Sequence, residues 1–401
     1  MTLITMSKRE LDRYQIISRL LRKEIDNRKA GELLHLSIRQ IKRLKKKVKQ
    51  SGAKGLIHGN RGRESNNRIP NKERARISDL IKNYYHDFGP TLANEKLLEL
   101  HHVSHDDKTI RQIMIDEDLW KPKNKKKSIH RSWRQRRSCF GEMQQFDGSY
   151  EYWFEDRGSK CCLLVSIDDA TGIVTYAQFG QNEGIDEVFS FWQGYLRHFG
   201  KPRSIYLDKF STYKMNPGIA KDNHELKTQF ERALSELHVE TIFANSPQAK
   251  GRVERLFGVL QDRLIKELRL AGISTIPEAN LFLKRKFLPR FNRKFSIPAA
   301  NPTNLHQLLT LKEQDNLDAI FSKQYIRTVQ NDFTVSFKNQ WYQLTNDQST
   351  TVCKSDQVTI EERPDQTVKF RLRGKYLNYR IIPKMLAKRE KSWVLAAVAN
   401  H

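Results

Sequence analysis

The fold of this chain depends on one stretch, Ser246-Pro247-Gln248-Ala249-Lys250-Gly251-Arg252-Val253-Glu254-Arg255-Leu256-Phe257-Gly258. Ser246 is suited to cap a helix, and Pro247 suits the first helical position, where its missing N–H is not needed. Apolar residues then recur at steps of three and four and predict a buried stripe: Val253, Leu256, Leu260 and Leu264, with Phe257 beside it. Glu254 falls just off this stripe, between two glycines that leave space for a metal ion and a phosphodiester. The alternative is a solvent-exposed Glu that pairs weakly with Lys250.

The charge of the chain predicts a polyanionic partner. Lys and Arg number 72 against 46 Asp and Glu, which gives a net charge of +26. Residues 1–140 hold 35 basic and 16 acidic side chains, or +19, which leaves 37 and 30, or +7, for the remainder. The amino-terminal third is therefore the stronger candidate for DNA binding.

Cysteine spacing and the amino terminus indicate a cytosolic protein. Cys139, Cys161, Cys162 and Cys353 show no metal-finger spacing, so we expect reduced thiols, with adjacent Cys161 and Cys162 on opposite faces of a strand. The first thirteen residues lack the apolar core of a signal peptide, and no apolar run is long enough to span a membrane. We expect a soluble, unexported protein in the bacterial cytoplasm, associated with the nucleoid.

The first 60 residues predict a helix-turn-helix unit. Helices are expected over 9–24 and 28–35, the second packing through Ala30, Leu33 and Leu34, and a third after Ser37 as N-cap. Ile41, Leu44 and Val48 would face inward. The outward side chains predicted to contact DNA bases and phosphates are Arg39, Gln40, Arg43 and Lys46. The alternative is an ordinary basic surface helix.

A second helical unit is predicted after a loop or linker over 52–70. One helix carries Ile77, Leu80, Ile81 and Tyr84, the next Leu92, Leu97, Leu98 and Leu100, and the third spans 109–119, with Arg111 and Gln112 as DNA-contacting candidates. The cluster His101, His102, His105, Asp106 and Asp107 lacks Cys partners, so a metal site there is disfavoured. Residues 121–138 hold nine basic side chains and no acid, which predicts a flexible cationic bridge that tracks phosphates through Lys125, Lys126 and Lys127. A solvated spacer is the alternative.

From Met143 onward, short β-rich runs alternate with helices. Strands are predicted at 144–147, 161–167, 173–179, 204–207 and 239–243, and helices at 185–199, at 226–237 and from Ser246 onward. This order, β-β-β-α-β-α-β-α, is that of an α/β ribonuclease H-like fold. Asp147, Asp208 and Glu254 then fall on the first strand, the end of the fourth strand and the last helix.

Several motifs of the chain resemble the DDE transposases, relatives of retroviral integrases, of the ISNCY insertion-sequence group. They are Gln145 to Ser149, Trp153 to Gly158, Ile167 to Gly172, Tyr206 to Lys209 and Ala244 to Gly258. The resemblance implies a catalytic triad of Asp147, Asp208 and Glu254 that holds two divalent ions, Mg²⁺ with Mn²⁺ as a substitute. Chemistry agrees, because two-metal catalysis needs carboxylates that converge from separate elements.

Rival acids are separated by topology. Strand two is expected to run antiparallel to strand one, so Asp168 would lie toward the start of strand one, away from Asp208. We expect Asp168 and Asp169 to stabilise the hairpin turn, and Asp156 to lie in the preceding turn. The basic residues that flank the triad would grip phosphates or simply be solvated: Lys209, Lys250, Arg252 and Arg255.

The carboxyl-terminal third alternates in short strands. A basic amphipathic segment is expected at 281–295, and a small β-barrel after it, which the family resemblance implies binds DNA without sequence preference; a protein-docking barrel is equally allowed. The expected domains are helix-turn-helix units at 1–60 and 70–120, a basic linker at 121–138, a catalytic core at 139–275, a helical connection at 276–322, the barrel at 323–385 and a tail at 386–401.

Together these features predict a multidomain DNA transposase. It would bind the terminal repeats of its element as double-stranded DNA, hydrolyse one strand, transfer the 3′-OH end to target DNA, and act as a homo-multimer assembled on DNA. The alternatives are a site-specific DNA-binding regulator with an inactive core, and a ribonuclease H-like nuclease without strand transfer.

Overall fold

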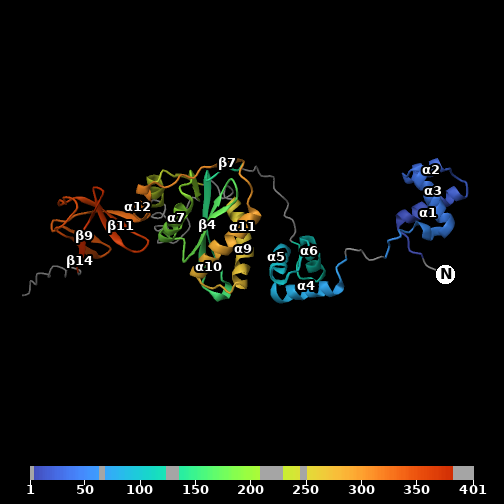
Figure 1. Cartoon of the computed structure of the whole chain (residues 1–401), viewed down its shortest axis with the longest axis horizontal. Helices are drawn as coiled ribbons and strands as arrows, with labels where there is room; N and C mark the ends of the chain where they lie inside the picture. The colour runs from blue at the N-terminus through green and yellow to red at the C-terminus, as the bar shows by residue number, and fades with distance from the viewer. Residues whose placement is uncertain (1–3, 63–67, 123–134, 208–228, 244–250, 383–401) are drawn as a thin grey trace, which may run out of the picture. The chain divides into compact units, whose positions relative to one another are not determined.

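The computed structural model of the chain describes residues 4–62, 68–122, 135–207, 229–243 and 251–382 (Figure 1). The chain separates into two units, residues 1–121 and 122–401, which are considered one at a time below. The finer domain boundaries expected from the sequence stay predictions. Within the described ranges, no helix has the length and apolar character needed to cross a membrane.

Three helices form the first part of the amino-terminal unit: α1 (Lys8–Leu21), α2 (Asn27–Leu34) and α3 (Ile38–Ser51). Side chains cap all three, and Ser37 accepts from the backbone N–H of Gln40 at 3.3 Å, as the sequence predicts. A shared core contains Ile17, Leu20, Ala30, Ile41, Leu44 and Val48. The apolar stripe therefore placed the inward face of α3 correctly.

Three details of this region differ from the prediction. Leu33 is exposed, because the face of α2 that packs is the one carrying Ala30 and Gly31. Gln40 is half-buried rather than fully outward. The expected loop begins with a 3₁₀ helix, η1 (Gly52–Leu56), that packs on α3; a Cβ on Gly55 would lie 2.5 Å from a backbone oxygen of α3.

A second group of helices follows: α4 (Asn71–Tyr84), α5 (Pro90–His101) and α6 (Asp107–Asp116). Their core includes Ile77, Ile81, Phe88, Leu92, Leu97, Ile110, Ile113 and Met114. Tyr84, Leu98 and Leu100, which are among the apolar residues that marked these helices in the sequence, are exposed. Tyr85 is buried in place of Tyr84, because α4 ends at Tyr84 and the chain turns Tyr85 inward, where its hydroxyl lies 2.9 Å from His101 Nε2.

A five-stranded mixed sheet forms the centre of the second unit, in the order β4-β3-β2-β5-β6. The strands are β2 (Met143–Glu151), β3 (Cys161–Asp168), β4 (Val174–Gly180), β5 (Ser204–Leu207) and β6 (Glu240–Phe243). The short 3₁₀ helix η2 (Glu155–Arg157), which contains Asp156, joins β2 to β3. β2, β3 and β4 are antiparallel neighbours, whereas β5 and β6 run parallel to β2. Each strand matches its sequence prediction within a few residues.

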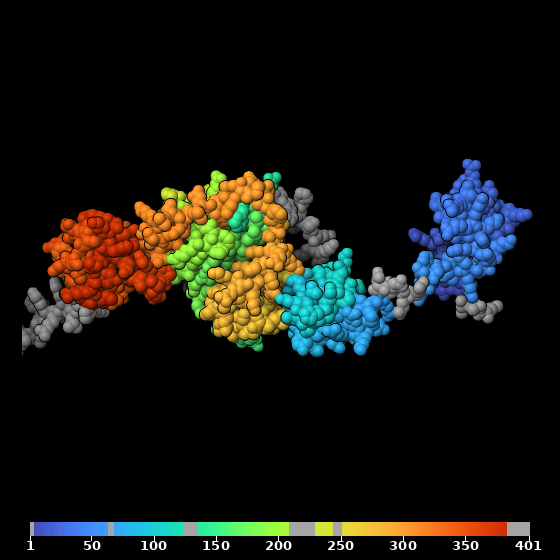
Figure 2. All heavy atoms as spheres, viewed as in Figure 1, coloured from blue at the N-terminus to red at the C-terminus, as the bar shows by residue number. Residues whose placement is uncertain are grey.

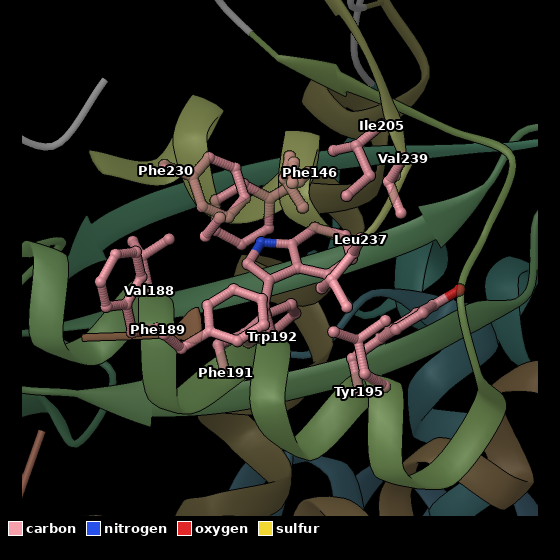
Figure 3. Close-up of a cluster of buried hydrophobic side chains, with 14 of the residues drawn as sticks. Phe146, Val188, Phe189, Phe191, Trp192, Tyr195, Ile205, Phe230, Leu237 and Val239 are labelled. Carbon is pink, nitrogen blue, oxygen red and sulfur yellow. The ribbon is translucent and has the colours of Figure 1, made fainter. Parts of the chain in front are cut away.

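One face of the sheet packs on α7 (Ile185–Phe199) and on the helical residues 229–236. Figure 3 shows Phe146, Ile205 and Phe230 gathered around Trp192, which is fully buried. The same core contains Cys162 and Leu164 of β3. Full burial of each such large side chain contributes about 1.5–3 kcal/mol, so this face is a main source of stability.

The opposite face packs on a series of helices (Figure 1), whose atoms form the yellow-orange surface beside the green residues in Figure 2. These are α9 (Gly251–Leu270), α10 (Ile276–Phe282), the π turn η4 (Leu283–Phe287) and α11 (Leu288–Phe295). The amphipathic segment expected at 281–295 is thus helical and contributes Phe282, Leu283, Phe287 and Phe291 to the core. Cys161 lies in this core and Cys162 in the opposite one, both as free thiols, which confirms their predicted placement.

The segment between α11 and the last strands also belongs to the packed region. β7 (Asn301–Asn304) pairs in parallel with β1 (Cys139–Phe140), and α12 (Leu311–Ile320) contributes Leu317 and Ile320 to the α7 core. The helical connection expected at 276–322 therefore packs on the core of this unit.

The carboxyl-terminal strands form two sheets that share one core. The strands are β8 (Lys323–Thr328), β9 (Thr334–Phe337), β10 (Gln340–Leu344), β11 (Gln357–Glu362), β12 (Val368–Leu372), β13 (Lys375–Leu377) and β14 (Tyr379–Ile382). The sheet orders are β13-β12-β11-β8 and β14-β10-β9. No strand pairing among the described residues joins them, so the prediction of a closed barrel is wrong. Both sheets bury side chains between them, including Val335, Tyr342, Val358, Ile360 and Phe370.

The Glu10 carboxylate predicts acid sensitivity of the first helical group. It accepts from the backbone N–H of Ser7 at 2.8 Å and pairs with Arg61. The Ser7 hydrogen bond, with help from Arg61, lowers the pKa of Glu10 from 4.5 to about 2. Because the folded-state pKa is depressed, this stabilisation is complete above pH 4.5 and is lost as the pH falls toward 2.

Thermal unfolding of a 1–121 fragment and its Glu10→Gln variant measures this effect. We expect the wild-type fragment to melt at the higher temperature at pH 6, and the two curves to converge as the pH approaches 2. A difference in melting temperature that is constant with pH contradicts the assignment.

Candidate active site

Asp147 lies near the middle of β2, on the face covered by α9. Its register partner on β3 is Val165, which belongs to the α9 core, whereas Phe146 next to it belongs to the α7 core. Side chains alternate between the two faces of a strand, so Gln145 and Ser149 share the side of Asp147. The Asp147 side chain is half-buried.

Glu254 lies in the first described turn of α9. The predicted stripe is confirmed, since Val253, Leu256, Phe257, Leu260 and Leu264 are all buried, and Glu254 beside it is exposed. The helix start predicted at Ser246 and Pro247, together with Lys250, lies outside the described residues.

Two contacts fix how α9 lies along β2. Near the start of both elements, the Asp169 carboxylate accepts from Gln145 Nε2 at 2.6 Å and from the Arg252 guanidinium. Farther along both, Gln261 Nε2 donates to Ser149 Oγ at 3.3 Å. β2 and α9 therefore run side by side in the same direction.

Asp147 and Glu254 both fall between these two contacts. Asp147 is midway between the two contacting residues of β2, and Glu254 follows the first contacting residue of α9 by two positions. The structure thus places two of the three predicted acids on adjoining elements. The third, Asp208, lies outside the described residues, as does Lys209; β5 ends at Leu207, one residue earlier.

Space beside Glu254 is open on its own helix. Among the described residues, a Cβ added to Gly258 would meet no atom within 4 Å, and one added to Gly251 would lie 3.8 Å from Arg255 Nη2. This agrees with the sequence argument that the absent side chains leave room for a ligand.

Asp168 has the structural role expected from the sequence. Its register partner is Gln144 at the start of β2, and its side chain accepts from the backbone N–H of Thr171 at 2.9 Å, from the Thr171 hydroxyl, from the backbone N–H of Gly141 and from Gln144 Nε2. Complete burial raises the pKa of Asp168 above its usual range. Its carboxylate oxygens are directed at these donors, so it ties the β3–β4 turn to the start of β2.

Asp169 departs from the prediction that it stabilises the turn. It is fully buried, and its carboxylate binds Gln145, Arg252 and the backbone N–H of Arg137. Arg252 is consequently held by an acid inside the protein, with 18% of its side chain exposed, which argues against its predicted phosphate contact. The sequence contained no signal for this pair, because its members are far apart in the chain.

The last residues of the predicted cationic bridge, 121–138, also bind at the β3–β4 turn. Arg136 Nη1 donates to the backbone oxygens of Asp169 at 3.4 Å and Ala170 at 3.3 Å. Neighbouring Arg137 donates its backbone N–H to the Asp169 carboxylate at 2.8 Å. The last residues of the bridge are therefore part of the core, whereas Lys125, Lys126 and Lys127 lie outside the described residues.

Comparisons with known proteins place this arrangement in a family. The chain is 40% identical over 384 residues to "Putative transposase y4bF" of Sinorhizobium fredii strain NGR234, covering 96% of this chain and 83% of that protein. The chain belongs to this transposase family. It is also 28% identical over 371 residues to the transposase for insertion sequence IS1202 of Streptococcus pneumoniae, covering 83% of this chain and 77% of that protein. No family model matches the chain.

Two solved structures show distant likenesses to the chain. A chain of the simian T-cell lymphotropic virus intasome in complex with PP2A regulatory subunit B56 gamma has a TM-score of 0.33 and 16% identity, over 74% of this chain and 100% of that one. The HTLV-2 integrase catalytic core domain in complex with magnesium has a TM-score of 0.27 and 21% identity, over 37% of this chain and 88% of that one. At these TM-scores the likeness carries no argument.

The residues expected to contact DNA differ in how far protein partners already engage their side chains. Arg39, Arg43 and Lys46 are exposed on α3, where with Ile38 and Lys42 they line one shallow groove. Arg111 and Gln112 are exposed on α6, but Arg111 lies 5.9 Å over Trp120 and Gln112 donates to Asp116 at 2.6 Å. Arg255 is exposed, with its Nε donating to the Gly251 carbonyl at 2.7 Å.

Members of the histidine cluster contact other groups of the protein. His101 contacts Tyr85, His105 Nε2 lies 3.0 Å from Glu73, and Asp106 caps α6. Within the described parts of the chain, no group of three or more His, Cys, Asp or Glu side chains could hold a metal ion. Two of the three predicted ligands lie within those parts.

Gly258 offers a test of the open space beside Glu254. We expect Gly258→Ala to raise the free energy of unfolding by about 0.5–1 kcal/mol, because Ala loses less backbone entropy in a helix and meets no atom there. Gly258→Leu should fold as well as wild type yet weaken binding of any ligand that uses the space. Denaturant unfolding together with DNA-binding measurements checks both expectations; an unstable Gly258→Ala protein contradicts them.

Proposed function

We propose that the chain is a DDE-type DNA transposase of the ISNCY group with a ribonuclease H-like core. It binds the ends of its insertion sequence, hydrolyses a strand to free a 3′-OH, and joins that end to target DNA. The observation that carries the proposal is the placement of Asp147 and Glu254 between the same two β2–α9 contacts, in a chain that belongs to a transposase family.

Asp147, Asp208 and Glu254 are the residues proposed to hold two Mg²⁺ ions, with Mn²⁺ as a substitute. The donor set fits, because hard oxygen ligands in small number suit Mg²⁺, which retains waters and phosphate oxygens. When bound, such ions supply an activated water or 3′-OH and stabilise the leaving oxygen. Asp208 follows Leu207 at the end of β5, the strand that pairs directly with β2.

The protein's own contribution is to hold and orient these groups. Both faces of β2 are packed, so the backbone that carries Asp147 is held firmly by its neighbours. Glu254 is exposed, and among the described residues the helix face next to it carries two glycines, which suits the approach of a phosphodiester backbone. Rigid elements and an open approach are what positioning a large substrate requires.

DNA recognition is assigned to the amino-terminal unit. Helices α1 to α3 form the proposed first helix-turn-helix, with Arg39, Arg43 and Lys46 exposed on its last helix. Helices α4 to α6 form a second, and the cationic bridge adds phosphate contacts. A homo-multimer that holds two DNA ends is proposed as the working form, because one triad serves one strand-transfer site and an element has two ends.

Two other functions are separated from this one by a single assay. A DNA-binding regulator with an inactive core binds end DNA but cuts nothing, and a nuclease cuts it but joins nothing to a target plasmid. The proposed transposase does all three in the presence of Mg²⁺.

The triad is tested by isosteric substitution. We expect Asp147→Asn, Asp208→Asn and Glu254→Gln each to reduce cleavage and strand transfer by at least a thousandfold, because metal-dependent chemistry loses a ligand, while end binding persists. Gel assays of labelled end DNA with a target plasmid measure all three activities. Asp262→Asn is the matched control, since Asp262 lies on the same helix, exposed and paired with Lys266 at 2.6 Å. Cleavage retained by Glu254→Gln contradicts the proposal.

Binding is tested with a fragment of residues 1–140. It should discriminate end DNA from random DNA without the core, and its affinity should fall steeply with salt as counterions are released. Arg43→Ala should reduce that discrimination by roughly tenfold if this side chain reads a base, in line with about 1–3 kcal/mol per specific contact. Fluorescence anisotropy at several salt concentrations measures both, and equal affinity of the wild-type fragment for the two DNAs would refute the assignment.

A further inference from the structure

A single buried carboxylate joins three separate segments of the core. Asp169 is fully buried at the β3–β4 turn, and its oxygens accept from Gln145 of β2 at 2.6 Å, from Arg252 of α9 and from the backbone N–H of Arg137 at 2.8 Å. Its own backbone N–H donates to the Met143 carbonyl at 3.0 Å, which fixes it to the start of β2. Every side of this carboxylate therefore has a partner on a different element.

Two of those partners stand two residues before the proposed metal ligands. Gln145 precedes Asp147 on the same side of β2, since side chains two apart in a strand share a face. Arg252 precedes Glu254 within one turn of α9. A shift of the Asp169 carboxylate is therefore transmitted to both acids through short, rigid lengths of backbone.

We infer that Asp169 is a positioning residue that sets the distance between Asp147 and Glu254, with Arg252 as its contact on α9. This inference rests on the proposed function of the two acids. Arg136 lies close enough to interact electrostatically with both Asp169 and Arg252. Removing the Asp169 charge takes away an attraction that opposes the repulsion between these arginines, so we expect the start of α9 to shift relative to β2.

The opposite end of α9 offers a matched control. There Arg269 pairs with Glu155 through two hydrogen bonds of 3.0 and 2.8 Å. Like the Asp169–Arg252 pair, this ion pair joins a carboxylate on the sheet side to an arginine of α9. It lies far along the helix from Glu254. Loss of the Glu155–Arg269 pair should destabilise the far end of α9 without changing the positions of Asp147 and Glu254.

The experiment uses four full-length variants: Asp169→Asn, Arg252→Gln, Arg252→Lys and Glu155→Gln. For each, the affinity for Mn²⁺ is measured by water-proton relaxation without DNA, and the Mg²⁺ concentration for half-maximal cleavage of end DNA is measured separately. Thermal melting and end-DNA affinity without metal are recorded alongside. Substituting residues that orient metal ligands commonly costs 10–100-fold in metal affinity, which sets the scale of the expected effect.

We expect Asp169→Asn and Arg252→Gln to weaken Mn²⁺ binding and to raise the Mg²⁺ midpoint by at least tenfold, with unchanged end-DNA affinity. Arg252→Lys, which keeps the charge, should fall between wild type and Arg252→Gln. Glu155→Gln should lower the melting temperature while leaving both metal measurements as in wild type. If Asp169→Asn does not fold, the two Arg252 variants carry the comparison.

Three results overturn the inference. They are wild-type metal behaviour of Asp169→Asn and Arg252→Gln, an equal metal shift in Glu155→Gln, and a loss of end-DNA affinity in Arg252→Gln without any change in Mn²⁺ binding. The last result would make Arg252 a DNA contact. Failure of the proposed function itself is distinguished by Glu254→Gln, which would then cleave like wild type.

Discussion

Burial of strand β2 on both faces is the constraint on which the rest of the core depends. Because its side chains alternate, Phe146 packs against Trp192 on one side while its neighbours face α9 on the other. A shift of one residue would bury Asp147 in the α7 core and turn Phe146 toward the solvent-accessible side of α9. The packing of aromatic residues thus fixes the register, and the register fixes which acid faces the last helix. Stability and the candidate site are specified by the same alternation.

The start of β2 carries a buried polar layer that this alternation divides in two. Gln144 bonds Asp168 toward one face and Gln145 bonds Asp169 toward the other, so two adjacent glutamines serve two adjacent acids. Desolvation of a carboxylate costs several kcal/mol, and each hydrogen bond to it returns about 1.5–3 kcal/mol. Burial raises the pKa of Asp168 despite the hydrogen bonds from Gly141 and Thr171. Asp169 differs in kind because it has a cation, Arg252, as a partner. Asp168 therefore links the turn to the start of β2, whereas Asp169 links it to both β2 and α9.

The sequence predicted those features that local periodicity encodes. The helical stripes of α3 and α9, the strand alternation and the hairpin role of Asp168 all depend on residues within a few positions of one another, and all are confirmed. Errors occurred where the decisive contact is distant or where an element ends. Tyr85 replaces Tyr84 in the core because α4 stops there, and the pairing of Asp169 with Arg252 joins the β3–β4 turn to a helix far along the chain. The two carboxyl-terminal sheets show the same limit, since alternation identifies strands but does not say whether the last one pairs with the first. Asp147 and Glu254 could be named as candidates because each lies on a strongly patterned element, whereas the Asp169–Arg252 pair that joins these elements leaves no pattern in the sequence.

Two ion pairs, Arg252–Asp169 and Arg269–Glu155, together fix the orientation of helix α9 on the sheet. Arg252 and Arg269 lie near its two ends, roughly 25 Å apart at about 1.5 Å per residue, and each is held by a carboxylate from the β2–β3–β4 region. With a single ion pair, α9 could still rotate about that contact relative to the sheet, because the hydrophobic contacts of its apolar stripe have little directionality. Two pairs at opposite ends remove that rotation, and between them Gln261 donates to Ser149 of β2. The helix can then present exposed Glu254 and the bare backbone at Gly258 to solvent without losing its alignment to the sheet. An open, uncrowded surface next to a firmly aligned carboxylate is therefore a consequence of placing the anchoring charges at the ends.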